Sequence, residues 1–179
     1  MPRAIEVVQY DSAWDEAFAR EASDLVHVFA DVLSGIHHIG STSIPGLAAK
    51  PIIDVLVVLR ETTTIDRFAR AMEGLGYRVR GECLDAEVPG TPGRFYFSKD
   101  TRGMRTHQVH VCALGHPEIT DKLAFRDYLR AHPHCAAGYG ALKARLALSH
   151  RHDIVGYIRG KDAFIKSTLD DASEWFHLR

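Results

Sequence analysis

The stretch that decides the fold of this chain is His38-Ile-Gly-Ser-Thr-Ser-Ile-Pro-Gly-Leu-Ala-Ala-Lys-Pro-Ile-Ile-Asp-Val-Leu-Val-Val-Leu59. It places a short apolar segment before a Gly-Ser turn, and then a second apolar segment that opens on one carboxylate, Asp54. A turn of small residues offers backbone N–H groups to an anion. A carboxylate at the start of a buried strand is a rigidly held ligand for a metal ion or a proton. Together these features are what phosphoryl or nucleotidyl transfer requires.

The composition is that of an ordinary globular domain. The 179 residues suffice for one domain with a core of its own, and the 22 basic and 23 acidic side chains nearly cancel. This balance predicts neither a nucleic-acid nor a membrane partner, and the longest apolar run, 51–59, has the length of a strand. An odd number of cysteines, without an apolar leader, predicts reduced thiols in the cytoplasm. We therefore expect a cytoplasmic protein with a small-molecule or nucleotide ligand; the sequence does not indicate its oligomeric state.

Hydrophobic periodicity predicts an α+β fold with a mixed sheet flanked by helices. We predict strands over residues 36–39, 52–59, 77–80, 94–99 and 106–113. We predict helices over residues 11–33, 65–75, 116–131, 133–149 and 153–169. Gly35 is expected to end the first helix, Thr62, Thr63 and Thr64 to cap the second, and residues 88–93 and 100–105 to form loops. The strand over 52–59 is nearly all apolar, so both of its faces should be covered.

Candidate ligand-binding residues follow the first predicted strand. The turn Gly40-Ser41-Thr42-Ser43 carries hydroxyls and backbone amides that can bind phosphate, although Gly-Ser turns are also common in purely structural roles. Lys50 could neutralise a phosphate or be a solvated lysine at the strand edge. Asp54 follows two isoleucines, and a carboxylate there is costly unless it is paired, hydrogen-bonded or metal-bound; the alternative role is a cap at the strand end.

A second candidate group is Arg105-Thr-His-Gln-Val-His-Val111. Because side chains alternate along a strand, His107 and His110 should point to opposite faces. His110 lies deeper in the apolar run and is either a partner of Asp54 or an ordinary core histidine. His38 could orient the turn or join Asp54 as a metal ligand. Lys143 shares a helix face with the tyrosine four residues before it.

These stretches closely resemble the GrpB family. The resemblance rests on residues 38–54, and on the later segments 105–111, 125–133 and 139–143 in the same order, and it covers about residues 5–170. It implies a single domain over 1–179, with a nucleotidyltransferase-like α/β core over 1–115 and a helical C-terminal part over 116–179. It also implies that the Gly40-Ser41 pair is a phosphate-binding turn and that Asp54 is the first metal carboxylate.

The sequence departs from the implied pattern at two positions. Nucleotidyltransferases carry a second acid two residues after the first, and here that position is Leu56. The GrpB pattern usually shows adjacent histidines in the later strand, and here Gln108 follows His107. Either His110 or His38 completes the site, or nucleotidyl transfer has been lost.

The lead hypothesis is a nucleotidyl- or phosphoryltransferase that uses a nucleoside triphosphate such as ATP on a small molecule. The Gly40–Ser43 turn, Lys50 and Lys143 would bind phosphates. Asp54 would hold a divalent metal, Mg²⁺ or Mn²⁺ rather than Zn²⁺, and His110 would be its second ligand or the general base. One alternative is a binding module without turnover, which Leu56 favours. Another is a hydrolase or ligase built on an Asp–His metal site.

Overall fold

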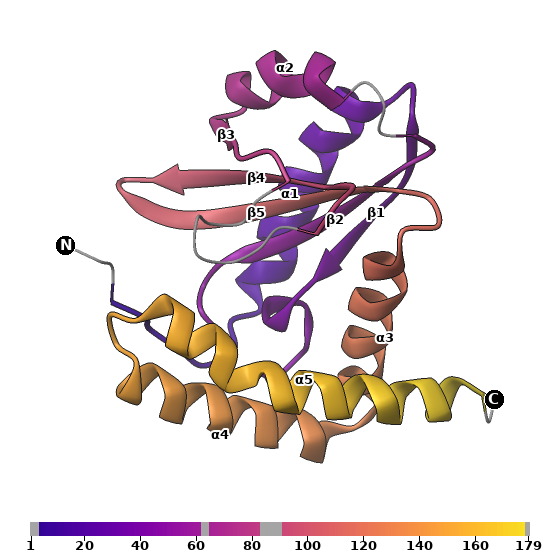
Figure 1. The fold of residues 1–179 in the computed structure, drawn as a ribbon. Helices are drawn as coiled ribbons and strands as arrows, with labels where there is room; N and C mark the ends of the chain where they lie inside the picture. Colours follow the sequence, from indigo (N-terminus) through magenta and orange to yellow (C-terminus); the bar gives the residue numbers. More distant parts are fainter. Residues whose placement is uncertain (1–3, 62–64, 83–90, 178–179) are drawn as a thin grey trace.

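The centre of the fold is a five-stranded mixed sheet, seen edge-on in Figure 1. The structure is a computed structural model that describes residues 4–61, 65–82 and 91–177. The strands are β1 (Leu33–Ile39), β2 (Ile53–Leu59), β3 (Tyr77–Val79), β4 (Arg94–Thr101) and β5 (Met104–Ala113). Their order is β1-β2-β5-β4-β3, and β2 and β5 run parallel while the other neighbours are antiparallel. The predicted α+β class with a mixed sheet is confirmed.

Helices cover the sheet and then form a separate layer at the C-terminal end (Figure 1). They are α1 (Ala13–Phe29), α2 (Ala69–Gly74), α3 (Pro117–Ala131), α4 (Pro133–Ser149) and α5 (Ile154–His177). Two short 3-10 turns, Ser41–Ser43 and Ile65–Phe68, precede β2 and α2. The predicted division at residue 115 stays a prediction, because the first half also packs on the helical part. Ile44 and Leu47 pack against α3 and α4, and Ile5 packs against Tyr157 of α5.

The sequence prediction that β2 is covered on both faces is confirmed. Val55 and Val57 belong to the main core, which α1 and α2 cover. Leu56 and Val58 point the other way and pack with Ile39, Cys112 and the apolar side of α3. Alternation along one strand therefore places successive residues in two different cores.

The end of the first helix and the turn of the β4–β5 hairpin differ from those predicted. Gly35 does not end the first helix: α1 ends at Phe29, and Gly35 lies inside β1 at an irregularity in its register with β2. The β4–β5 hairpin has no six-residue loop, since only Arg102 and Gly103 separate its strands. Both have positive φ, 52° and 78°, which is the conformation of a tight two-residue hairpin turn.

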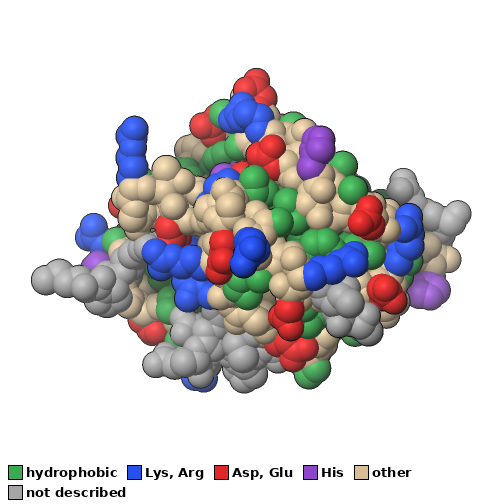
Figure 2. Space-filling model, turned by 90° about the horizontal axis from the view of Figure 1, so that it is seen from above, with side chains coloured by type: hydrophobic (Ala, Val, Ile, Leu, Met, Phe, Trp, Pro, Cys, Tyr) green, Lys and Arg blue, Asp and Glu red, His purple; other side chains and the backbone are tan. Residues whose placement is uncertain are grey.

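The last helix is longer than predicted, because α5 continues to His177. The three threonines expected to cap the second helix, and residues 88–90 of the predicted loop, lie outside the described residues. Within the described part, no helix is both long enough and apolar enough to cross a membrane. On the face seen in Figure 2, basic and acidic side chains lie beside one another, as the near balance of charge leads one to expect.

Candidate functional site

The turn after β1 is shaped around the carboxylate of Asp54. Gly40 has φ 70° and ψ −173°, a conformation that favours glycine. A Cβ atom at this position would overlap the Asp54 side chain. Glycine is therefore required twice, by its backbone angle and by the close approach. Gly40 and Ser41 remain partly exposed beside the carboxylate.

The other two hydroxyls of the turn are used inside the fold. Thr42 and Ser43 are each 1% exposed. Ser43 Oγ donates to the Gly40 carbonyl at 2.6 Å, and Thr42 Oγ1 donates to the Ile52 carbonyl at 3.3 Å. The expectation that these hydroxyls face a ligand is therefore not met, because they satisfy the backbone carbonyl groups of Gly40 and Ile52. Only the first half of the predicted phosphate turn faces outward.

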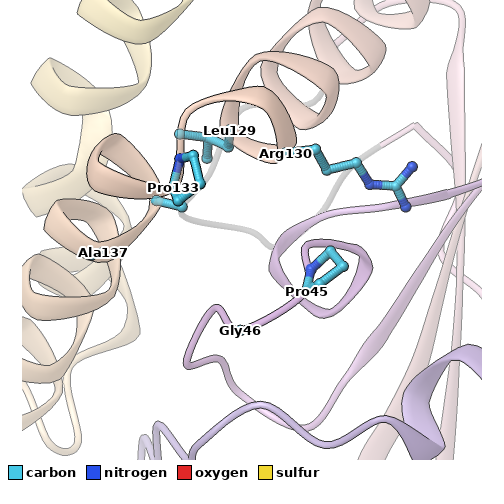
Figure 3. Close-up of a pocket in the computed structure, with 7 residues that line it drawn as sticks. Pro45, Gly46, Leu129, Arg130, Pro133 and Ala137 are labelled. Atoms are coloured by element: carbon cyan, nitrogen blue, oxygen red, sulfur yellow. The ribbon is translucent and has the colours of Figure 1, made fainter.

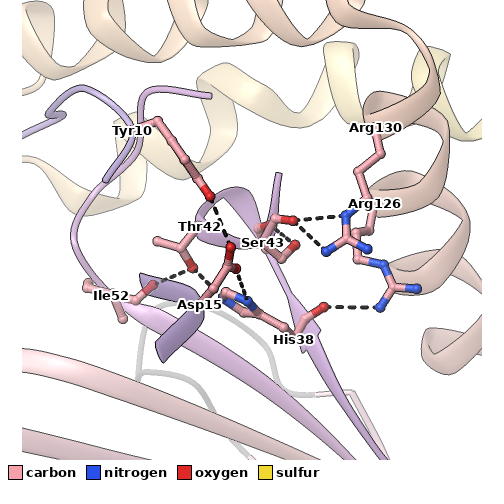
Figure 4. A network of polar contacts seen from close by, with 9 residues as sticks. Tyr10, Asp15, His38, Thr42, Ser43, Ile52, Arg126 and Arg130 are labelled. Carbon is pink, nitrogen blue, oxygen red and sulfur yellow. Dashed lines mark hydrogen bonds and ion pairs between the residues drawn. The ribbon is translucent and has the colours of Figure 1, made fainter. Parts of the chain in front are cut away.

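His38 lies on the opposite side of the sheet from Asp54. It pairs in register with Val55, so its ring points towards α1, where it stacks on Phe18 at 4.7 Å. Its Nε2 lies 3.1 Å from Thr42 Oγ1, and its Nδ1 lies 3.5 Å from Asp15 (Figure 4). Burial lowers the pKa of His38 to about 4, so the ring is neutral at pH 7. The structure does not bring His38 together with Asp54 as a ligand pair; it holds the turn instead.

Two arginines of α3 fix the ends of the same turn (Figure 4). Arg126 Nη1 donates to the His38 carbonyl at 3.1 Å. Arg130 donates to the Ser43 carbonyl from both Nε and Nη2, at 2.9 and 2.7 Å. Charge-assisted bonds of this kind are stronger than neutral ones. The turn is thus held from α1 through His38 and from α3 through the arginines.

Asp54 and His110 come together as the alternation predicts. Asp54 pairs in register with Gln108, and His110 lies two residues further on the same face. His110 Nε2 is 3.8 Å from Asp54 Oδ1, and His110 Nδ1 is buried without a hydrogen-bond partner. Burial lowers the pKa of His110, which therefore favours the neutral, proton-accepting form. His107 points to the other face, 3.6 Å from Glu21 on α1.

Three lysines from three different segments lie within electrostatic range of Asp54. Lys50 precedes β2, Lys143 belongs to α4 and Lys161 to α5. Lys50 Nζ and Lys161 Nζ lie over one ring, that of Tyr157, at 5.3 and 4.7 Å from its centroid. Among the residues that the structure describes, none of the three lysines has a carboxylate within 4 Å.

Lys143 is the most enclosed of the three. It is 2% exposed, its Nζ has no hydrogen-bond partner, and it lies 4.6 Å from the centroid of Tyr139. Tyr139 is 4% exposed and packs with Ile44 and Leu47, which follow the turn. Burial lowers the pKa of Lys143 to about 7 and that of Lys161 to about 8, while the Asp54 charge opposes both shifts. Asp54 is thus the acid whose charge reaches all three lysines.

Lys161 is a residue that the sequence reasoning missed. Tyr139 and Lys143 are four residues apart on α4, and Tyr157 and Lys161 repeat that spacing on α5. Each pair places its ammonium group over its own tyrosine ring. The repeated Tyr-x-x-x-Lys pattern was the available signal.

The donor set fits a metal ion that is shared with a ligand. Asp54 is 26% exposed and offers one carboxylate, with the His110 imidazole beside it. The described residues contain no group of three or more His, Cys, Asp or Glu side chains that could hold a metal. Mg²⁺ commonly takes one or two carboxylates and completes its shell with substrate phosphates and water, whereas Zn²⁺ needs three or four protein ligands. The residues present therefore fit Mg²⁺ or Mn²⁺ better than Zn²⁺.

A separate cavity of about 550 Å³ opens where α3 meets α4 (Figure 3). Its lining is formed by Pro45, Gly46, Leu129, Arg130, Pro133, Ala136 and Ala137. Neither Asp54 nor His110 nor any of the three lysines belongs to this lining. The largely apolar cavity is therefore distinct from the charged site.

Comparison with known proteins gives relatives of similar sequence. The family described as GrpB protein matches residues 4–171. The UPF0157 protein YqkA of Bacillus subtilis is 44% identical over 173 residues, which cover 97% of this chain. The chain spans only 48% of that relative's own length.

Two solved structures extend the comparison. The conserved protein GrpB from Enterococcus faecalis is 40% identical, with a TM-score of 0.87 over 96% of this chain and 99% of that one. A structure of Cid1, described as having RNA terminal uridylyl transferase activity, is 16% identical, with a TM-score of 0.50 over 80% of this chain and 44% of the other. At that identity the likeness concerns the fold alone, which is of the nucleotidyltransferase type.

Proposed function

The chain belongs to the GrpB family, and we propose that it binds a nucleoside triphosphate with a divalent metal ion and transfers a nucleotidyl or phosphoryl group to a small molecule. One observation carries the proposal: the buried Lys143 has no partner for its Nζ, and the charge of Asp54, which lies against Gly40 of the turn, acts on both Lys143 and Lys50. Ammonium groups without an acidic partner, within electrostatic range of one carboxylate, are suited to a metal-bound polyanion. The fold, shared with nucleotidyltransferases, supports the same reading.

Each part of the site has a role in this proposal. Ser41 and the turn amides bind phosphate oxygens, and Lys50 and Lys143 offset their charge. Asp54 would hold the metal, which supplies electrostatic stabilisation of the reacting phosphate when bound. His110 is the general base, because burial keeps it neutral and its Nε2 faces Asp54.

The transfer step is an in-line displacement. The oxygen or nitrogen of the acceptor forms a bond to phosphorus, and the bond from that phosphorus to the bridging oxygen breaks. Attack on the α-phosphate releases pyrophosphate, and attack on the γ-phosphate releases the nucleoside diphosphate. His110 takes the proton that the acceptor loses.

A second candidate, nucleotide binding without turnover, is favoured by Leu56. This residue is 0% exposed and packs with Ile39, Val58 and Cys112 under α3. Its position on the strand is the one where a second acid would complete a two-metal arrangement. The site would then bind phosphate groups without catalysing their transfer.

Calorimetry and isotope labelling test both candidates. We expect ATP with Mg²⁺ to bind the wild-type chain, Asp54→Asn to remove the metal dependence, and Asp170→Asn, an exposed control on α5, to leave it intact. The chain is then incubated with small-molecule acceptors and ATP labelled at the α- or the γ-phosphate. Transferred α-label indicates nucleotidyl transfer, transferred γ-label indicates phosphoryl transfer, and binding without either supports the second candidate. Identical metal-dependent binding by the Asp54→Asn variant would overturn the proposed role of this site.

A further inference from the structure

We propose that the ligand of this site is recognised by a chain of three phosphates, and that Lys161 of α5 completes a three-lysine binding surface with Lys50 and Lys143. The inference rests on the proposed function and narrows it. It assigns a role to a residue on the last helix, and it predicts that the number of phosphates, rather than the nucleoside, sets the affinity.

The three lysines lack acidic partners. Lys143 is buried with an unpartnered Nζ. The described residues place no carboxylate within 4 Å of any of the three lysines, and Asp162, next to Lys161 in sequence, acts on it only at longer range. A buried charge without a partner is expensive. An anion from outside the fold is the partner that would relieve this cost.

The positions of the three ammonium groups favour an extended anion. Lys50 and Lys161 both lie over the Tyr157 ring, which is 1% exposed, and Lys143 lies over Tyr139, which is 4% exposed. The ammonium groups are therefore held by buried rings rather than by mobile surface contacts. They come from three separate elements, so one small anion such as a monophosphate cannot engage them as fully as a longer polyphosphate can.

The charges of Asp54 and the three lysines favour a ligand with several negative charges. This carboxylate is the acid whose charge reaches all three lysines. A divalent cation bound there would offset the carboxylate and leave the lysines to neutralise the ligand. One phosphate group carries a charge of about −1.5 to −2 at pH 7, which is less than the charge of three ammonium groups, so a longer phosphate chain matches the three lysines better.

Calorimetric titration at fixed pH and ionic strength tests the inference with four probes: inorganic tripolyphosphate, ATP, ADP and AMP. We expect tripolyphosphate to bind without a nucleoside, and affinity to fall from ATP to ADP to AMP. Lys161→Met should weaken ATP binding by about tenfold or more, and Lys161→Arg should restore most of the loss. Lys166→Met, on the exposed side of the same helix, is the matched control.

Two results would overturn the inference: AMP binding as tightly as ATP, or Lys161→Met behaving as Lys166→Met does while circular dichroism shows both variants folded. These failures differ from failure of the proposed function, which appears as nucleotide binding that does not depend on Asp54 or as absence of nucleotide binding altogether. If tripolyphosphate binds through Lys161 without Mg²⁺ and Asp54→Asn has no effect, the lysine surface stands and the metal-dependent transfer does not.

Discussion

Two lysines of this molecule, the partly buried Lys99 and the buried Lys143, both lie over tyrosine rings and have different partners. Lys99 lies 5.1 Å from the Tyr77 ring centroid, and its Nζ donates to both oxygens of Glu21 at 2.9 and 3.0 Å. Lys143 lies 4.6 Å from the Tyr139 ring centroid and has no carboxylate partner among the described residues. The fold itself neutralises the first lysine. The described part of the fold offers no such partner to Lys143, which is therefore suited to an anionic ligand.

This difference separates a structural ion pair from a ligand site. Glu21 is 6% exposed and binds Lys99 on the α1 side, close to His107. On the other side, the nearest equivalent acid, Asp54, is partly exposed and faces three lysines. A surplus of buried positive charge on one side only is expected of a protein that binds an anion there. Mutations should therefore act with opposite sign at the two lysine sites.

The largest expected effect is the loss of the structural pair. Glu21→Gln removes the charge that neutralises Lys99, and breaking a buried pair typically costs about 3–5 kcal/mol. Because the Lys99 side chain is 21% exposed, we expect about 3 kcal/mol, measured by urea unfolding. The double variant Glu21→Gln/Lys99→Met should recover part of this loss, since it leaves no unpaired charge. If the Glu21→Gln variant is as stable as the wild type, the Glu21–Lys99 pair does not stabilise the fold, and the contrast between Lys99 and Lys143 is wrong.

At the ligand site, a substitution is expected to raise the free energy of unfolding rather than lower it. Lys143→Met removes an unpartnered buried ammonium group, and we expect the empty protein to become more stable by roughly 1–3 kcal/mol. Nucleotide affinity should fall at the same time, because the lysine is held for the ligand. Lys166→Met, an exposed substitution, should change the free energy of unfolding by less than about 0.5 kcal/mol. If Lys143→Met destabilises the empty chain and leaves nucleotide binding unchanged, Lys143 is structural.

The sequence predicted the parts of this site that depend on one strand or one turn. The apolar run of β2 and the small residues before it placed Asp54 beside the Gly40–Ser41 turn. Alternation along β5 placed His110, and not His107, on the Asp54 face. Such features follow from the alternation of side chains along a strand, which can be read directly from the sequence.

The parts that were missed depend on register and packing. His38 faces α1 because it pairs with Val55, and that register is not visible in a single strand. Lys161 joins the site because α5 lies against α4, and the sequence does not state which helix faces meet. The inward hydroxyls of Thr42 and Ser43 follow from the arginines and carbonyls that fix the turn in three dimensions.

The smallest expected effect is a pH dependence that belongs to the unpaired lysines alone. Burial lowers the pKa of Lys143 from 10.5 to about 7, so above pH 7 the unfolded chain binds a proton that the folded chain has lost. Stability of the empty protein should therefore rise with pH between 7 and 8.5, by up to about 1.4 kcal/mol per unit for each such lysine. Below pH 7 both states are largely protonated at Lys143, and this contribution levels off. His38, with its pKa lowered to about 4, contributes only between about pH 4 and its ordinary value of 6.5.

Unfolding in urea at several pH values measures this slope, and Lys143→Met should reduce it. Saturating ATP should also flatten the slope, since a bound polyanion favours the protonated lysine. A slope that survives both Lys143→Met and ATP would mean that other groups set the pH response, and that the unpaired lysine does not titrate with the empty site.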